Sequence, residues 1–292
     1  MWRQWAALGS MASASRRAQS IVDPEALLLL SFILTPYHRR LVDEIHWWAA
    51  AGSGVTSVQR IRNLARTFGP SELIERGLAA FARAALELGR DARWRSLASG
   101  AGALAPRRHE HLMSDLQFIE PPALMVRLRV GFGVGSKSDL LCFLLGSHGS
   151  SASVRDIARA TGYTRKAIQN SAGDMSKARF LEALDDHPAA YRAEPAPWRE
   201  LLGWKSLPNW KHWAPLYRFV AAVSLRFDGR QELPRSPYVL ASRMRDLYVE
   251  HREAFRWNRI PHPAPERSRG EAYSEAFRGL LVQTAGWLEE NA

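Results

Sequence analysis

The stretch SVRDIARATGYTRKAIQ, residues 153–169, constrains the fold more than any other part of this chain. Two helices that cross closely need a small residue where they touch, a turn residue that tolerates positive φ, and a β-branched anchor on the second helix. Ala158, Gly162 and Ile168 have these properties at the matching spacings of four and six residues, and Ile157 supplies a further core contact. The sequence therefore predicts a helix-turn-helix.

More elements are expected on both sides of this motif. Ser153, followed three residues later by Asp156, resembles a capping box and predicts where the first helix begins. In MVRLRVGF, residues 125–132, apolar and basic residues alternate, which is the period of a short half-buried strand. A turn at residues 185–188 predicts a hairpin. The expected helices cover 136–145, 153–161 and 164–178, and the strands of the hairpin cover 179–184 and 190–194.

Strand, helix, helix-turn-helix and two-stranded hairpin follow one another in residues 123–195. In this order the segment resembles the winged helix-turn-helix DNA-binding domains of bacterial transcriptional regulators. Such domains place the second helix of the motif in the major groove, and their hairpin, the wing, touches the DNA backbone or the minor groove. The resemblance therefore implies that residues 164–178 form a recognition helix for double-stranded DNA.

The resemblance and the side-chain chemistry together indicate which residues contact DNA. Arg or Lys can bridge guanine edges, and Gln or Asn can pair with adenine. The residues expected to face base edges are Thr164, Arg165, Lys166, Gln169 and Asn170. The expected phosphate contacts, which set register, are Lys177, Arg179 and Arg192. Asp174, Asp185 and Asp186 would repel phosphate, which leaves open a wing that lies away from DNA or contacts a protein.

Helical signals fill the rest of the chain. An Asp cap followed by Pro opens DPEALLLLSFIL at residues 23–34, and this is the pattern of a helix start. The expected fold is mainly α, with a central winged helix-turn-helix of α+β type, bearing a small β-hairpin wing, between two all-helical domains. The expected parts are a flexible leader at 1–22, an N-terminal helical domain at 23–118, the winged helix-turn-helix domain at 121–195 and a C-terminal helical domain at 196–292. Further helices are expected at 39–51, 55–68, 71–88, 213–227, 236–257 and 271–290.

The composition indicates which kinds of binding partner and which cellular compartment to expect. Lys and Arg number 40 against 29 Asp and Glu, for a formal charge of +11, and this excess favours polyanions such as nucleic acid. The single cysteine, Cys142, excludes an internal disulfide and an all-cysteine zinc site, and it favours a reducing compartment. No apolar run reaches the roughly 18 to 20 residues that a membrane span needs.

Other motifs in the sequence are weaker indications of a functional site. GFGVGSKS resembles a phosphate-binding loop, but Ser136 stands where its last glycine belongs, and a helix cap explains the same letters. A nucleotidyltransferase loop would need a second carboxylate where Leu141 stands. Residues 109–111, HEH, could chelate a metal, but no nearby cysteine completes a tetrahedron, so an exposed linker is favoured. Arg60, Arg62 and Arg66 form either a second phosphate-binding face or a solvated helix face.

We therefore expect a bacterial, cytoplasmic transcriptional regulator, with no cofactor, metal or catalytic site. A repressor of this kind works as a homodimer, because one recognition helix reads few base pairs and two-fold pairing doubles the site. The expected helix at 236–257 offers a dimer or domain-packing face at Leu240, Met244, Leu247, Tyr248 and His251. The alternative is a winged-helix antitoxin or defence-system component whose helical domains bind a protein partner.

Overall fold

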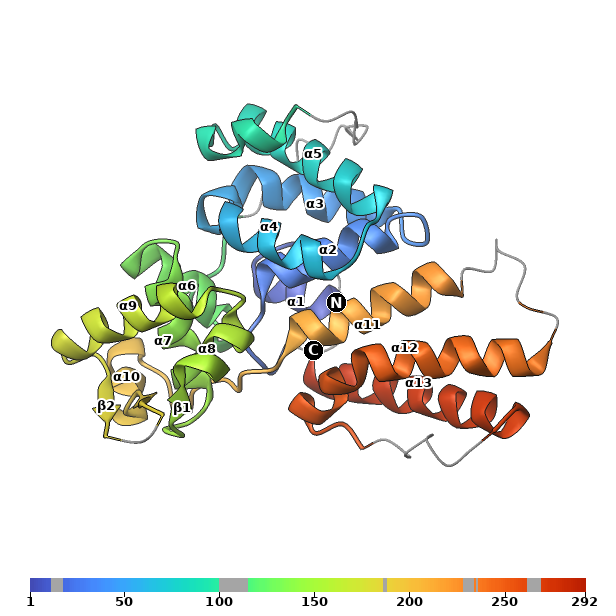
Figure 1. Ribbon diagram of the computed structural model, residues 1–292. Coiled ribbons are helices and arrows are strands. Elements are labelled where there is room, and N and C mark those ends of the chain that lie inside the picture. Colours follow the sequence, from blue (N-terminus) through green and yellow to red (C-terminus); the bar gives the residue numbers. More distant parts are fainter. Residues whose placement is uncertain (12–17, 100–114, 186–187, 228–233, 235, 262–268) are drawn as a thin grey trace.

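The computed structural model describes residues 1–11, 18–99, 115–185, 188–227, 234, 236–261 and 269–292, and it is mainly helical with one small antiparallel sheet (Figure 1). Its buried apolar residues form two large clusters. One cluster joins helices from both ends of the chain, and we call this part the helical body, residues 1–99 and 211–292. The other lies in the central module, residues 121–210.

The helical body is built around helix α2, Pro24–Leu34. Asp23 caps this helix by accepting a hydrogen bond from the Ala26 N–H at 3.1 Å, as the sequence predicts. Every residue from Pro24 to Ile33 is buried, because α2 is apolar on all sides and lies among other helices. The helices that pack against it are α1 (Trp2–Ala7), α3 (Arg40–Ala51), α4 (Val58–Thr67), α5 (Glu72–Glu87) and α11 (Trp213–Arg226). Helix α12 (Pro237–Asn258) packs on α11 and α13 (Glu271–Asn291) packs on α12, and the short 3-10 turns η1 (Ser53–Val55) and η2 (Ala92–Leu97) also belong to this part.

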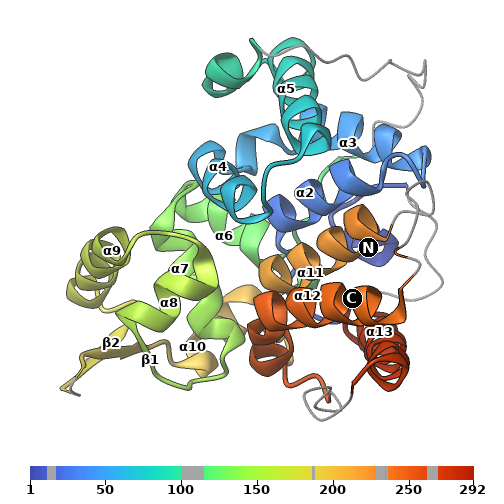
Figure 2. The ribbon, with the colours of Figure 1, turned by 45° about the vertical axis from the view of Figure 1, so that its right-hand side comes forward.

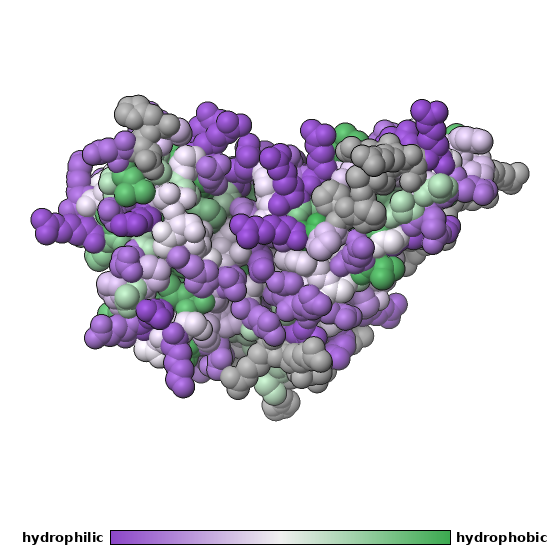
Figure 3. Space-filling model, turned by 90° about the horizontal axis from the view of Figure 1, so that it is seen from below, coloured by the Kyte–Doolittle hydropathy of each residue, from purple (hydrophilic) through white to green (hydrophobic). Residues whose placement is uncertain are grey.

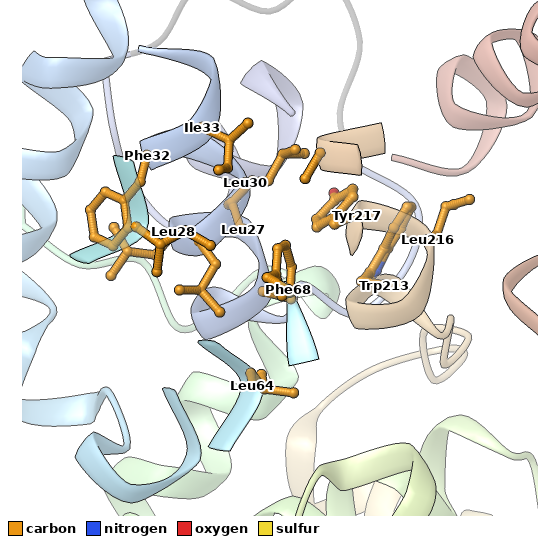
Figure 4. Packing of buried hydrophobic residues seen from close by; sticks show 14 of the residues in the cluster. Leu27, Leu28, Leu30, Phe32, Ile33, Leu64, Phe68, Trp213, Leu216 and Tyr217 are labelled. Carbon is orange, nitrogen blue, oxygen red and sulfur yellow. The ribbon is translucent and has the colours of Figure 1, made fainter. Parts of the chain in front are cut away.

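The two helical stretches at the ends of the chain share one core. Figure 4 shows apolar side chains of α2 packed together with Leu64 of α4, with Phe68 just beyond the end of α4, and with Trp213, Leu216 and Tyr217 of α11. The buried residues of α12 and α13 belong to the same cluster. The described helices from the two ends of the chain therefore pack in one core, in which α11 and α2 complete each other's burial, whereas the sequence predicts two separate helical domains.

The expected flexible leader at residues 1–22 is also wrong where the structure describes it. Helix α1 packs on the core, and its Trp5 is fully buried and donates a hydrogen bond to Ser31 Oγ at 3.2 Å. Further along, Val22 is buried and donates its N–H to the Pro122 carbonyl at 2.9 Å. Aromatic and aliphatic residues thus fix this segment, although its basic residues suggested an exposed leader.

The central module contains a short turn, five helices and three short strands. In chain order these are η3 (Pro121–Ala123), α6 (Leu124–Phe132), α7 (Ser136–Gly146), β1 (Ala152–Ser153), α8 (Val154–Thr161), α9 (Arg165–Lys177), β2 (Glu182–Leu184), β3 (Ala190–Arg192) and α10 (Pro195–Leu202). The strands form an antiparallel sheet in the order β1-β3-β2, with Tyr191 opposite both Ala152 and Ala183. The predicted hairpin strands are thus present but shorter than expected, and β1 adds a third strand.

The strand predicted within residues 125–132 is wrong, because this segment forms helix α6. The alternation of apolar and basic residues suggested that one side faces water. Instead Arg129 is 1% exposed, since buried carboxylates accept its hydrogen bonds, and Leu128 beside it is buried too. Burial therefore does not follow the alternation, since Arg129 and Leu128 are both buried while Val130 is 57% exposed, and the period of two does not predict the backbone conformation.

Candidate functional site

Local hydrogen bonds fix both helices of the helix-turn-helix. Ser153 Oγ accepts from the Asp156 N–H at 3.2 Å and donates to its carboxylate at 2.6 Å, which starts α8. Gly162, with φ of 77°, ends α8 in the left-handed conformation that glycine adopts without strain. Thr164 Oγ1 then accepts from the backbone N–H three residues later at 3.2 Å and starts α9. These are the boundaries that the sequence predicts.

The residues expected to hold the two helices together are placed accordingly. Ile157, Ala158 and Ile168 are buried in the central module. A Cβ added at Gly162 would lie 3.3 Å from the Leu64 side chain of α4, so the turn of the motif also touches the helical body. The packing between α8 and α9 therefore depends on the small and β-branched residues that defined the motif.

Most of the predicted DNA contacts share the exposed face of α9. Figures 1 and 2 both show this helix at the outer edge of the central module, on the side away from α13. The exposed residues are Thr164, Arg165, Lys166, Gln169, Asn170, Lys177 and, just beyond the helix, Arg179. Arg192 is different, because it is half-buried and pairs with Glu182 across the sheet at 2.7 Å.

The first two turns of α9 offer donors without internal partners. Arg165, Lys166, Gln169 and Asn170 form no hydrogen bond or ion pair with any residue that the structure describes. No acidic residue lies in the first turn. We call these four side chains the α9 donor face. Long polar side chains left unpaired on one helix face can bond a ligand that carries several acceptors.

The acidic residue expected to oppose DNA is neutralised. Asp174 pairs with Lys137 of α7 at 2.8 Å, and this hydrogen bond lowers the pKa of the Asp174 carboxyl. Asp185 is exposed after β2, and Asp186 lies outside the described residues. Lys137, which belongs to the segment GFGVGSKS, therefore reduces the repulsion that Asp174 was predicted to exert on phosphate near the end of α9.

A second feature lies where the central module meets the helical body. Asp23, Glu25, Arg60, Arg129 and Asp139 form a cluster in which each side chain is between 0% and 4% exposed. They come from the N-cap of α2, from α2 itself, and from α4, α6 and α7. We call this group the buried charge cluster. Such groups are stable inside a protein only when they are paired and hydrogen-bonded.

The two arginines satisfy all three carboxylates of the buried charge cluster. Arg129 donates to Glu25 at 2.6 Å and 3.0 Å and to Asp139 at 2.7 Å through two nitrogens. Arg60 donates to both carboxylate oxygens of Asp23 at 2.6 Å and to Glu25 at 2.5 Å. Burial by itself would raise the pKa of Glu25, but the charges of Arg129 and Arg60 outweigh it and lower the pKa to about 2.

The buried charge cluster reaches the turn of the helix-turn-helix. Arg60 Nε donates to the Thr161 carbonyl at the end of α8 at 2.6 Å. Tyr163, in the turn, donates its hydroxyl to Asp139 at 3.0 Å. Burial, and then the charge of Asp139, raise the pKa of Tyr163 above its usual range, so it stays a donor. The helical body therefore holds the start of α9 in a fixed position.

The buried charge cluster is hard to predict from the sequence. Glu25 and Arg129 stand in apolar stretches, which is unusual for charged residues, and this was the only available signal. Their partners could not be paired from spacing, because Glu25 and Arg129 are 104 residues apart. Arg60, considered as a phosphate contact, is fully buried, whereas Arg62 bonds Ser96 at 2.6 Å and Arg66 is exposed.

The other candidate motifs do not gather into a site. In the segment that resembles a phosphate-binding loop, Ser136 begins α7, and its Oγ lies 2.7 Å from Ser171 Oγ on α9. This serine therefore forms a hydrogen bond between the two helices. Residues 109–111 lie outside the described residues. In the part of the chain that the structure describes, His, Cys, Asp and Glu side chains form no group that could hold a metal ion. Among the described helices, none combines the length and apolar character needed to cross a membrane.

Comparison with known proteins adds no family. No protein-family model matches this chain, and neither a curated protein nor a solved structure is significantly similar to it. The features that bear on function are therefore the α9 donor face and its surroundings.

Proposed function

We propose that this chain is a sequence-specific DNA-binding transcriptional regulator, a repressor that acts as a homodimer and uses its central module as a winged helix. The observation that carries the proposal is the α9 donor face. It presents two cationic and two amide side chains on the first two turns of an exposed helix, without internal partners among the described residues. These are the side chains that bond base edges in the major groove.

The arrangement of the module supports a winged-helix interpretation. Helix α7, strand β1, helices α8 and α9, and the pair β2 and β3 follow one another, and β1 joins the pair in one sheet. In winged-helix proteins the second helix of the motif enters the major groove while the hairpin touches the flanking backbone. In this interpretation α9 is the recognition helix and the segment joining β2 to β3 is the wing.

Each exposed residue then has a role that follows from its chemistry. Arg165 and Lys166 would bond the acceptors of guanine, and Gln169 and Asn170 would pair with adenine. Lys177, on the last turn of α9, would contact phosphate and set register. Arg192 is occupied by Glu182, so we do not assign it to DNA.

The buried charge cluster would serve this function by positioning α9. A helix that reads bases must hold its side chains within a fraction of an ångström of the edges they bond. Two residues of the helical body contact the two sides of the turn that precedes α9: Arg60 donates to the Thr161 carbonyl at 2.6 Å, and Ser57 Oγ accepts from the Tyr163 hydroxyl at 3.4 Å. The reading helix is thereby held as one unit with the helical body, instead of moving on a hinge.

The test is binding of the purified chain to DNA from directly upstream of its own coding region, against scrambled DNA of equal length, in a salt series. We expect a preference for the upstream DNA that persists as salt rises, since only phosphate contacts weaken strongly with salt. The double variant Arg165→Ala with Gln169→Ala should lose at least about tenfold of that preference, because a good base contact discriminates by about 1–3 kcal/mol.

A matched control uses the same two residue types elsewhere. Arg252 on α12 and Gln283 on α13 are exposed, so the pair Arg252→Ala with Gln283→Ala should leave both preference and thermal stability unchanged. Equal binding to both DNAs that disappears with salt would refute the proposal. A stable complex with a co-expressed protein, without DNA preference, would instead support the antitoxin interpretation.

A further inference from the structure

The central module carries an apolar hollow that the α9 donor face does not use. Its volume is about 430 Å³, and Phe180, Leu181, Pro197 and Trp198 line it between the end of α9 and helix α10. We call it the α10 hollow. An apolar concavity on a module that is already packed internally is surface available to a partner.

Two partly exposed phenylalanine rings lie at the α10 hollow. Phe132 and Phe180 are 40% and 42% exposed, and their ring centroids lie 5.6 Å apart in an edge contact. Both pack on the buried ring of Trp198, which lies 6.0 Å from Phe132 and 6.1 Å from Phe180. On the face seen from below in Figure 3, hydrophilic side chains predominate and hydrophobic ones form small separate patches. Exposed aromatic side chains beside an apolar hollow are typical of a protein contact.

The same surface carries a projecting side chain. Leu201, on α10, lines the edge of the hollow and is 71% exposed. A surface with both an apolar hollow and a projecting apolar side chain can fit a copy of itself, because a two-fold axis exchanges the two features. The shape therefore favours a second copy of this chain over an unrelated partner.

The charges at the edge point to the same occupant. Arg179 and Glu194 both line the hollow and both are exposed. Neither side chain forms a hydrogen bond or an ion pair within 4 Å with another residue that the structure describes, although the charge of Glu194 also acts on Arg192. Opposite charges on one edge are self-complementary. A two-fold axis through the hollow would place Arg179 of each subunit near Glu194 of the partner subunit.

We propose that the α10 hollow is the contact between two copies of this chain, with Leu201 of each copy in the hollow of the other. This inference rests on the proposed function, which requires two recognition helices. The hollow lies at the end of α9, whereas the α9 donor face lies on its first two turns, so the contact leaves that face uncovered. The face expected on α12 is not available, because Met244, Leu247 and His251 are buried within the helical body.

The test is the mass of the full chain in solution without DNA, measured by sedimentation over a range of concentrations. We expect a dimer that Leu201→Glu weakens by at least about tenfold in dissociation constant, because a charge would then enter an apolar hollow. Val282→Glu is the matched control, since Val282 is 72% exposed on α13 and far from the hollow in sequence. It should leave the dimer unchanged.

Charge exchange makes the test specific. Arg179→Glu alone and Glu194→Arg alone should each weaken the dimer, and the two together in one chain should restore it, because each subunit then offers the reversed pair. A monomeric wild-type chain, or a dimer unaffected by Leu201→Glu, would overturn the inference. A monomeric Leu201→Glu variant that still prefers upstream DNA would support sequence-specific DNA binding but overturn the need for a dimer. A dimer without DNA preference would overturn the proposed function and leave the dimer contact supported.

Discussion

Replacing Arg129 by Met tests whether the buried charge cluster holds the two parts of the molecule together. The variant keeps an unbranched side chain of similar length but removes the cation. Arg129 is 1% exposed and donates five hydrogen bonds, two each to Glu25 and Asp139 and one to the Val55 carbonyl at 3.0 Å. Without it, two buried carboxylates lose their strongest partner.

The expected loss follows from that geometry. Breaking a buried ion pair by removing one partner costs about 3–5 kcal/mol, since the remaining charge stays buried. The pKa of Glu25 has the sign that this reasoning requires. It is lowered to about 2 by the charges of Arg129 and Arg60 against the opposing effect of burial, so the folded chain stabilises the ionised carboxylate. We therefore expect the free energy of unfolding at pH 7 to fall by about 3–5 kcal/mol, a large part of the 5–15 kcal/mol typical of native proteins.

Urea unfolding followed by circular dichroism measures this loss. Arg76→Met is the control, because Arg76 is 55% exposed and pairs with Glu72 only at 3.4 Å, so it should change stability by less than about 0.5 kcal/mol. A loss below about 1 kcal/mol in Arg129→Met would refute the reasoning, since it would mean that water reaches the carboxylates.

The pH dependence gives a second check with a defined sign. In the wild-type chain the folded pKa of Glu25 is depressed, so its stabilisation is complete above pH 4.5 and is lost as the pH falls from 4.5 toward 2. In Arg129→Met this carboxyl has lost its main counter-charge and protonates at higher pH. The difference between variant and wild type should therefore shrink on acidification, and a constant difference would contradict the electrostatic explanation.

Two glycines of the helix-turn-helix give further predictions. Gly162→Val places a β-branched residue at φ of 77°, with its Cβ 3.3 Å from the Leu64 side chain. We therefore expect the free energy of unfolding, measured with urea, to fall by about 1–3 kcal/mol. A variant of normal stability would show that the backbone at residue 162 does not have this conformation. Gly173 lies on the exposed side of α9 with open space around it, so Gly173→Ala should stabilise the chain by about 0.5–1 kcal/mol. If α9 enters the major groove, the added methyl should also weaken DNA binding, whereas Gly279→Ala, equally open on α13, should stabilise without that effect.

Local rules explain what the sequence could predict. The Asp23 cap with Pro24, and the spacing of Ala158, Gly162 and Ile168, each place their determinants within a few residues, and the structure has α2, α8 and α9 at those positions. The ends of these helices could be predicted because an N-cap or a left-handed turn depends on a single residue.

Long-range pairing explains what the sequence could not predict. The segment of α6 looked like a strand because the burial of Arg129 depends on Glu25, far away in the chain. Strand β1 has only two residues, too few to show a period. The shared core of α2 and α11 was missed because an apolar helix does not reveal which neighbour covers it. The residues of the predicted DNA contact could be named from sequence, but their freedom from internal partners could not.

The buried charge cluster also limits how this chain can change in evolution. Lysine cannot replace Arg60 or Arg129, since a single ammonium group lacks the planar set of donors that reaches two carboxylates and a carbonyl at once. Loss of Arg60 removes the ion-pair partner of Asp23, and loss of Arg129 leaves Asp139 with only Arg60 at 3.9 Å. In proteins descended from the same ancestor, Asp23, Glu25, Arg60, Arg129 and Asp139 should therefore be retained or exchanged as a group, even where the exposed face of α9 has diverged.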